Sequence, residues 1–117
     1  MAHSEITQLY IDWFQNSYPE WFNFQNNTGY ASFEHVKYGI PNTGGGFDFI
    51  CFGPDAKTMF FEIKTIGYPT LKKNQKNFRD QMIKKGFKCW VFKELKESPG
   101  FYVIPAQDYR PFAKWPY

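Results

Sequence analysis

Three charged residues interrupt two apolar runs in the middle of this chain. Residues 47–64 read FDFICFGPDAKTMFFEIK, with Asp48 in the first run and Glu62 and Lys64 in the second. The Gly-Pro-Asp sequence between the runs is typical of a turn, so the two runs predict an antiparallel strand pair. Pairing would bring two carboxylates and an amine together. Two carboxylates this close repel each other unless a cation neutralises them, and Mg²⁺ suits such hard oxygen ligands.

The alternative is an ion network on a solvent-facing side of the sheet, which would contribute little to stability. Side chains alternate between the two faces of a strand, so Phe60, Glu62 and Lys64 share one face. Residues 59, 61, 63 and 65 share the other, more apolar face. The flanking Phe, Ile, Cys and Met residues do not suit a wet face and favour a functional site over the surface network.

Two helical segments are predicted on either side of these strands. Apolar residues recur with helical spacing over Ser4–Tyr18, where Ser4 is the expected N-cap and Pro19 follows the end. Glu5 lies in the first turn, where an acidic side chain complements the helix dipole. In the second segment, Leu71–Lys85, one stripe contains Gln75 among apolar residues, and a glutamine there is unusual.

The remaining elements are expected to be strands. Trp21–Phe33 has turn residues near its centre, with a short strand predicted on either side, and residues 38–46 form a glycine-rich loop. Lys88–Lys93 and Phe101–Ile104 predict two further strands, and the tail from Pro105 a short helix with an irregular end. The order αβββαββ favours the α/β class (α+β), with a mixed β-sheet flanked by helices.

Length and composition indicate one domain spanning residues 1–117. The two cysteines lack metal-ligand spacing, and the two histidines form no cluster, so a zinc site is not expected. The N-terminal residues lack the basic start and apolar run of a signal peptide, and no run is long enough to span a membrane. A cytoplasmic location without membrane contact is the expectation.

Positive charge is concentrated in one third of the chain. Residues 64–96 contain ten basic residues and two acidic ones. Such a segment favours a polyanionic partner, and a solvated lysine-rich face is the alternative. On the predicted second helix, basic side chains gather near the first turns. They are Lys72, Lys73, Lys76 and Arg79.

Four segments together resemble one nuclease superfamily. They are GIPNTGGGFDFI at residues 39–50, FEIKT at 61–65, LKKNQKNF at 71–78 and KKGFKCWVF at 84–92. In this order they are similar to the PD-(D/E)xK nucleases and, within them, to the VRR-NUC (virus-type replication-repair nuclease) family. The resemblance covers about Ser4–Lys93 and implies a restriction-endonuclease-like core. The glycine-rich segment is longer than the usual G-x-P-G-G, and the residues after Ser98 do not match.

The resemblance implies a role for each matching residue. Asp48 and Glu62 would bind Mg²⁺ or Mn²⁺ together with the main-chain carbonyl of Ile63. Glu5 matches the acidic residue of the family's first helix, and Asp12 competes for that position. Lys64 would orient the attacking water and stabilise charge at the phosphate.

The same resemblance implies that Gln75 points into the site, which accounts for its place in an apolar stripe. The basic side chains of residues 72, 73, 76 and 79 would grip backbone phosphates, a contact that carries no base specificity. Activity requires no organic cofactor in this scheme.

The expected function is therefore a metal-dependent deoxyribonuclease acting on structured or branched DNA. Small members of the superfamily resemble Holliday-junction resolvases, so a homodimer from a phage or bacterial cell is expected. One rival is a non-catalytic nucleic-acid-binding domain that uses the basic helix 71–85. A binding domain has no use for paired carboxylates beside phosphates, because they repel each other. The third hypothesis is a structural protein whose charges form a surface network.

Overall fold

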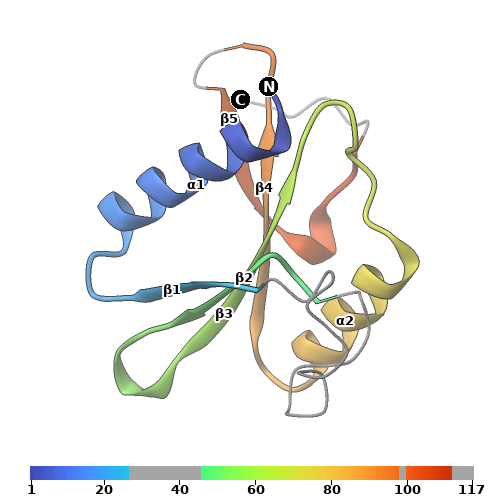
Figure 1. Cartoon of the computed structure of the whole chain (residues 1–117). Coiled ribbons are helices and arrows are strands. Elements are labelled where there is room, and N and C mark those ends of the chain that lie inside the picture. The colour runs from blue at the N-terminus through green and yellow to red at the C-terminus, as the bar shows by residue number, and fades with distance from the viewer. Residues whose placement is uncertain (27–45, 98–99, 112–117) are drawn as a thin grey trace.

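The computed structural model describes residues 1–26, 46–97 and 100–111 of the chain. Two helices and five strands form the described fold (Figure 1). The elements are α1 (His3–Ser17), β1 (Phe22–Gln25), β2 (Phe49–Phe52), β3 (Thr58–Lys64), α2 (Lys73–Lys84), β4 (Lys88–Glu94) and β5 (Phe101–Pro105). Short 3-10 turns follow β2 at Pro54–Ala56 and β5 at Ala106–Asp108.

The strands form one sheet in the order β1-β2-β3-β4-β5. β3 and β4 run parallel, whereas the other three neighbouring pairs are antiparallel. A parallel pair needs a crossover connection, and α2 provides it between β3 and β4. The predicted class, a mixed sheet with flanking helices, is confirmed.

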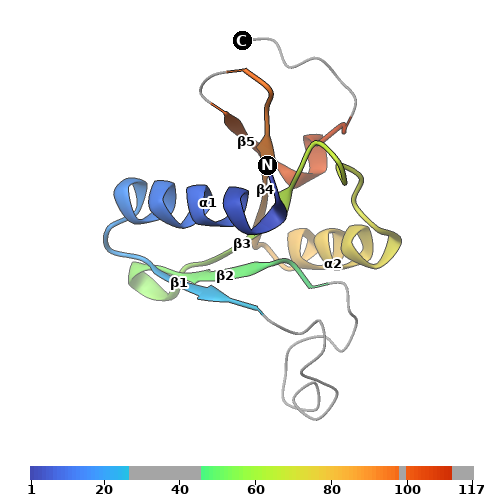
Figure 2. The ribbon, with the colours of Figure 1, turned by 45° about the horizontal axis from the view of Figure 1, so that its top comes forward.

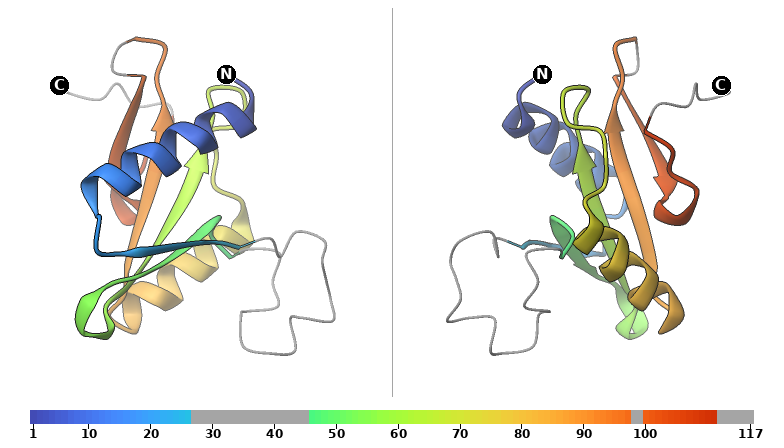
Figure 3. Two further views of the ribbon diagram at one scale, coloured as in Figure 1. Left: turned by 60° about the vertical axis from the view of Figure 1, so that its left-hand side comes forward. Right: turned by 90° about the vertical axis from the view of Figure 1, so that its right-hand side faces the viewer.

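The two helices lie on opposite sides of the sheet (Figures 2 and 3). On the α1 side, Tyr10 and Phe14 pack against Phe61 of the sheet, and all three side chains are buried. On the α2 side, the ring of Phe78 meets that of Phe60 edge-on, with centroids 5.1 Å apart. Apolar side chains therefore cover both faces of the central strands, and Glu62 and Lys64 of β3 are buried among them.

Alternation along β3 is as predicted from its sequence. Phe60 belongs to the cluster beneath α2, whereas Phe61 and Ile63 belong to the cluster beneath α1. All residues from Met59 to Lys64 are buried. Glu62 and Lys64 thus lie on the α2 face without the solvent that a surface ion network requires.

Several predicted boundaries shift. α1 begins at His3, so the N-cap is Ala2 and the prediction of Ser4 at that position is wrong. β2 begins at Phe49, two residues later than predicted, because the main-chain groups of Asp48 bond to Asn26 and to a side chain of β3. The second strand expected within Trp21–Phe33 and most of the loop at residues 38–46 lie outside the described residues.

Neither helix in residues 1–26, 46–97 and 100–111 is long and apolar enough to cross a membrane.

Candidate active site

Asp48 and Glu62 face each other across the β2–β3 hairpin. The register pairs Ile50 with Phe60, so two residues further along Asp48 comes opposite Glu62. The main-chain N–H of Asp48 donates to Oε1 of Glu62 at 3.1 Å. The N–H of Ile63 donates to Oδ2 of Asp48 at 2.8 Å. Each carboxylate is therefore fixed by a main-chain donor of the neighbouring strand.

Gln75 joins the carboxylates to the lysine. Its Nε2 donates to Oε2 of Glu62 at 2.8 Å, and its Oε1 accepts from Nζ of Lys64 at 3.1 Å. The same Oε1 accepts from the main-chain N–H of Lys72 at 2.9 Å, where α2 begins. Nζ of Lys64 also lies 3.4 Å from Oε2 of Glu62. The structure thus unites four residues of the predicted site, including the glutamine that interrupts the apolar stripe.

Burial differs across this group. Glu62, Lys64 and Gln75 are 3%, 6% and 9% exposed, respectively. The Asp48 side chain is 30% exposed, so the site meets solvent at Asp48. A ligand would approach from that side.

The electrostatics of Glu62 are unfavourable for a bare carboxylate. Burial is the largest cause that raises its pKa well above the ordinary value of 4.5, and the negative charge of Asp48 raises it further. The ammonium of Lys64 lowers this pKa but does not cancel the other two effects. An additional positive charge beside the two carboxylates would favour the ionised form.

The donor set fits a hard divalent cation that keeps part of its own water. No group of three His, Cys, Asp or Glu side chains suited to a metal occurs in the described segments. Mg²⁺ is commonly held by only one or two carboxylates, with waters and substrate phosphates completing its coordination. Asp48 and Glu62 would be the protein ligands. The role of the Ile63 carbonyl stays a prediction.

The resemblance implies that Glu5 reaches the metal, but in the structure its side chain bonds to the main chain of its own helix. Its side chain is exposed, and Oε1 accepts from the main-chain N–H of Ala2 at 3.0 Å, which stabilises the start of α1. Asp12, its competitor, is exposed further along the helix and accepts from Gln8. Membership of Glu5 in the site stays a prediction. His3 comes closer, with Nε2 at 3.9 Å from Oδ2 of Asp48.

The basic residues of α2 divide into two kinds. Lys72, Lys73 and Lys76 are exposed around the start of the helix. Arg79 is partly buried, and its guanidinium donates to Oδ1 of Asp80 at 2.8 Å and to the carbonyl of Ala106 at 3.4 Å. The three lysines are therefore the better phosphate contacts. Arg110, which sequence reasoning missed, lines a cavity of about 320 Å³ together with Lys76 and Arg79.

Two further buried charges escaped sequence reasoning. Lys93 is opposite Lys64 in the β3–β4 register, and its Nζ donates to the carbonyl of Glu94 at 2.9 Å. Oε1 of Glu94 accepts from the N–H of Ile66 at 3.0 Å, which anchors the segment leaving β3. The only sequence signal was a pair of charges closing an apolar strand. Nothing local indicates that this strand lies beside β3.

Fold and site together define an α+β protein with a buried carboxylate–amide–ammonium network on one face of a mixed sheet. Comparison of the sequence with known protein families found no match. Comparison with curated proteins found no significant match.

Replacing Gln75 by leucine is expected to destabilise the protein by about 1–3 kcal/mol, because buried partners on Glu62 and Lys64 lose their hydrogen bonds. Urea unfolding followed by circular dichroism measures this change. The matched control is Gln81→Leu, an exposed position on the same helix, where a change within about 0.5 kcal/mol is expected. Equal effects of the two substitutions would contradict a structural role for the Gln75 network.

Proposed function

We propose that this protein is a metal-dependent nuclease that hydrolyses phosphodiester bonds in DNA. The observation that carries the proposal is the hydrogen-bonded group of Asp48, Glu62, Gln75 and Lys64 at the β2–β3–α2 junction. It combines paired oxygen ligands with a fixed cation, and it is open to solvent at one carboxylate.

The energetics of Glu62 argue against a purely structural role. A buried carboxylate beside a second carboxylate is unfavourable, and an apolar residue of similar size would avoid the penalty. Groups with strongly shifted pKa values in a cleft are frequent at functional sites. The pairing also disfavours the rival of a non-catalytic binding domain, since the two carboxylates would repel the phosphates that such a domain binds.

The division of labour follows from the contacts. When bound between Asp48 and Glu62, Mg²⁺ or Mn²⁺ would supply charge neutralisation and a more acidic water. Gln75 holds Glu62 and Lys64 in fixed positions, so neither must reorganise during the reaction. The ammonium of Lys64 would stabilise negative charge on a phosphate at the carboxylates and orient the attacking water.

The finer proposal is a PD-(D/E)xK nuclease similar to the VRR-NUC family. It is supported by Asp48 and the E-x-K sequence on adjacent strands, a helical glutamine after them, and a parallel strand beyond. Branched DNA as substrate and a homodimer as the active form belong to this finer proposal. One chain offers one such site, so cutting two strands at once needs two copies.

The deciding experiment is a cleavage assay with matched DNA structures. The protein is incubated with linear duplex, single-stranded and four-way-junction DNA of shared sequence, with Mg²⁺, Mn²⁺ or EDTA. Metal-dependent products are expected, with the junction cut faster than the duplex. No metal-dependent cleavage of any substrate would refute the nuclease proposal. Cleavage of all substrates at one rate would refute only the preference for branched DNA.

A charge-matched pair of variants tests the DNA-contacting surface. The first variant replaces the exposed lysines at the start of α2 by glutamine: Lys72, Lys73 and Lys76. The control replaces three exposed lysines elsewhere: Lys84, Lys85 and Lys96. DNA affinity is measured as a function of salt concentration.

The first variant is expected to bind more weakly, and the slope of log K against log[salt] to fall by about 0.9 for each lost contact with duplex phosphate. The control should keep the wild-type slope. Equal slopes in the two variants would show that the start of α2 does not contact the phosphates.

A further inference from the structure

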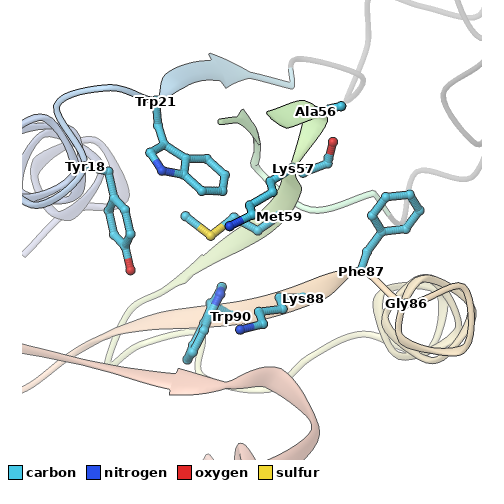
Figure 4. A pocket seen from close by; sticks show the side chains of 10 residues that line it. Tyr18, Trp21, Ala56, Lys57, Met59, Gly86, Phe87, Lys88 and Trp90 are labelled. Atoms are coloured by element: carbon cyan, nitrogen blue, oxygen red, sulfur yellow. The ribbon is translucent and has the colours of Figure 1, made fainter. Parts of the chain in front are cut away.

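A cavity of about 510 Å³ lies away from the carboxylates, where three connections meet. These are the segment after α1, the turn between β2 and β3, and the turn between α2 and β4 (Figure 4). Its floor includes Met59 and Trp90, which belong to the α1 side of the sheet. Glu62 lies on the other side, where Gln75 of α2 donates to it, and neither carboxylate lines the cavity, so the cavity is separate from the candidate active site.

The walls are aromatic and held by packing. Trp21 and Trp90 lie on opposite sides of the side chains of Lys57 and Met59 (Figure 4). The indole of Trp21 rests on Gly53 so closely that a Cβ at this position would overlap it. The ring of Tyr18 meets the same indole edge-on at 5.8 Å. A planar ligand would therefore find surfaces that are already in place.

The charged side chains that line the cavity are both cationic. Lys57 and Lys88 both line it, and none of its lining residues is acidic. The indole Nε1 of Trp90 is buried and has no hydrogen-bond partner among the described residues. Buried donors without a partner are uncommon in folded proteins.

We propose that this cavity binds a nucleotide, with the base on the indole rings and the phosphate on Lys57 and Lys88. Bases stack on aromatic side chains regardless of their identity, and a phosphate is a favoured partner of lysine. The volume is within the range of small-molecule sites. The nucleotide is either free or the 5′-phosphorylated end of a strand, because the two share this chemistry.

Calorimetric titration in EDTA tests the site without any metal-dependent reaction. The probes are thymidine 5′-monophosphate and thymidine, and a 5′-phosphorylated oligonucleotide is compared with its 5′-hydroxyl form. The double variant Lys57→Gln/Lys88→Gln removes both cations. Its control, Lys84→Gln/Lys96→Gln, changes the net charge equally at exposed positions outside the cavity.

The expected result is saturable binding of the monophosphate, about tenfold tighter than that of thymidine. The cavity double variant should lose about this factor, whereas its control should bind as the wild type does. Displacement of the monophosphate only by the phosphorylated oligonucleotide assigns the site to strand ends, and failure to displace it assigns the site to free nucleotides.

Three results would overturn the proposal: no saturable binding, equal affinity for thymidine and its monophosphate, or an unchanged double variant that folds normally by circular dichroism. A Glu62→Gln variant should bind the nucleotide as the wild type does. Failure of the nuclease proposal would therefore leave this one standing, and the reverse also holds.

Discussion

The Lys64→Met variant is expected to cleave DNA more slowly than the wild type by a factor of about 10²–10⁴. Methionine keeps most of the apolar bulk of this buried side chain but removes the ammonium that Gln75 and Glu62 hold. Without it, the network would offer no ammonium to a phosphate bound at the carboxylates. Single-turnover cleavage at saturating metal measures the chemical step directly.

Lys93→Met is the matched control for this substitution. Lys93 is also buried and sits opposite Lys64 in the β3–β4 register, but its ammonium donates to the carbonyl of Glu94. Its loss should change the cleavage rate by only a few fold. If both variants lose the same activity, the effect belongs to buried lysines in general, and the role assigned to Lys64 is wrong.

Divalent metal is expected to stabilise the protein, and more strongly at pH 8 than at pH 6. The pKa of Glu62 is raised in the metal-free fold, by burial first and by Asp48 second. The folded state therefore binds this proton more tightly than the unfolded state does. The stabilising contribution is complete below the unfolded pKa and is lost as the pH rises through the raised folded pKa.

Metal binding reverses this trend because it requires the ionised carboxylate. At 100 times its dissociation constant, a ligand adds about 2.7 kcal/mol of stability, or roughly 10 °C in the melting temperature of a domain of this size. Thermal melts with Mg²⁺, Mn²⁺ or EDTA at the two pH values measure the shift. The absence of a metal-dependent shift at both pH values would contradict metal binding at Glu62.

The variants Asp48→Asn and Asp55→Asn each remove one negative charge. Comparing them distinguishes an effect of the site from an effect of net charge. Asparagine at position 48 can still accept from the N–H of Ile63, but it removes the proposed metal ligand and the charge that raises the pKa of Glu62. The metal-dependent shift should disappear and the pH dependence should flatten. Asp55 is exposed in the turn at positive φ, which asparagine tolerates, so its variant should melt as the wild type does.

Local patterns in the sequence were enough to predict the hairpin and the face that carries the site. The turn between two aromatic runs predicts the strand pair, and alternation places Glu62 and Lys64 together. These inferences depend on neighbours within a few residues, where backbone geometry determines which side chains share a face. The pattern alone marks the glutamine in an apolar helical stripe as unusual, and only the family resemblance implies that it points into the site.

Relations between distant segments were decided only by the tertiary structure. The parallel pairing of β4 with β3 places Lys93 beside Lys64, and the position of α1 brings His3 near Asp48. The aromatic cavity combines three connections that no local pattern relates. Such contacts depend on how helices and strands pack to bury their apolar faces, and that packing is a property of the whole fold. Residue types and their spacing thus indicate which side chains could do chemistry, whereas packing brings particular ones together.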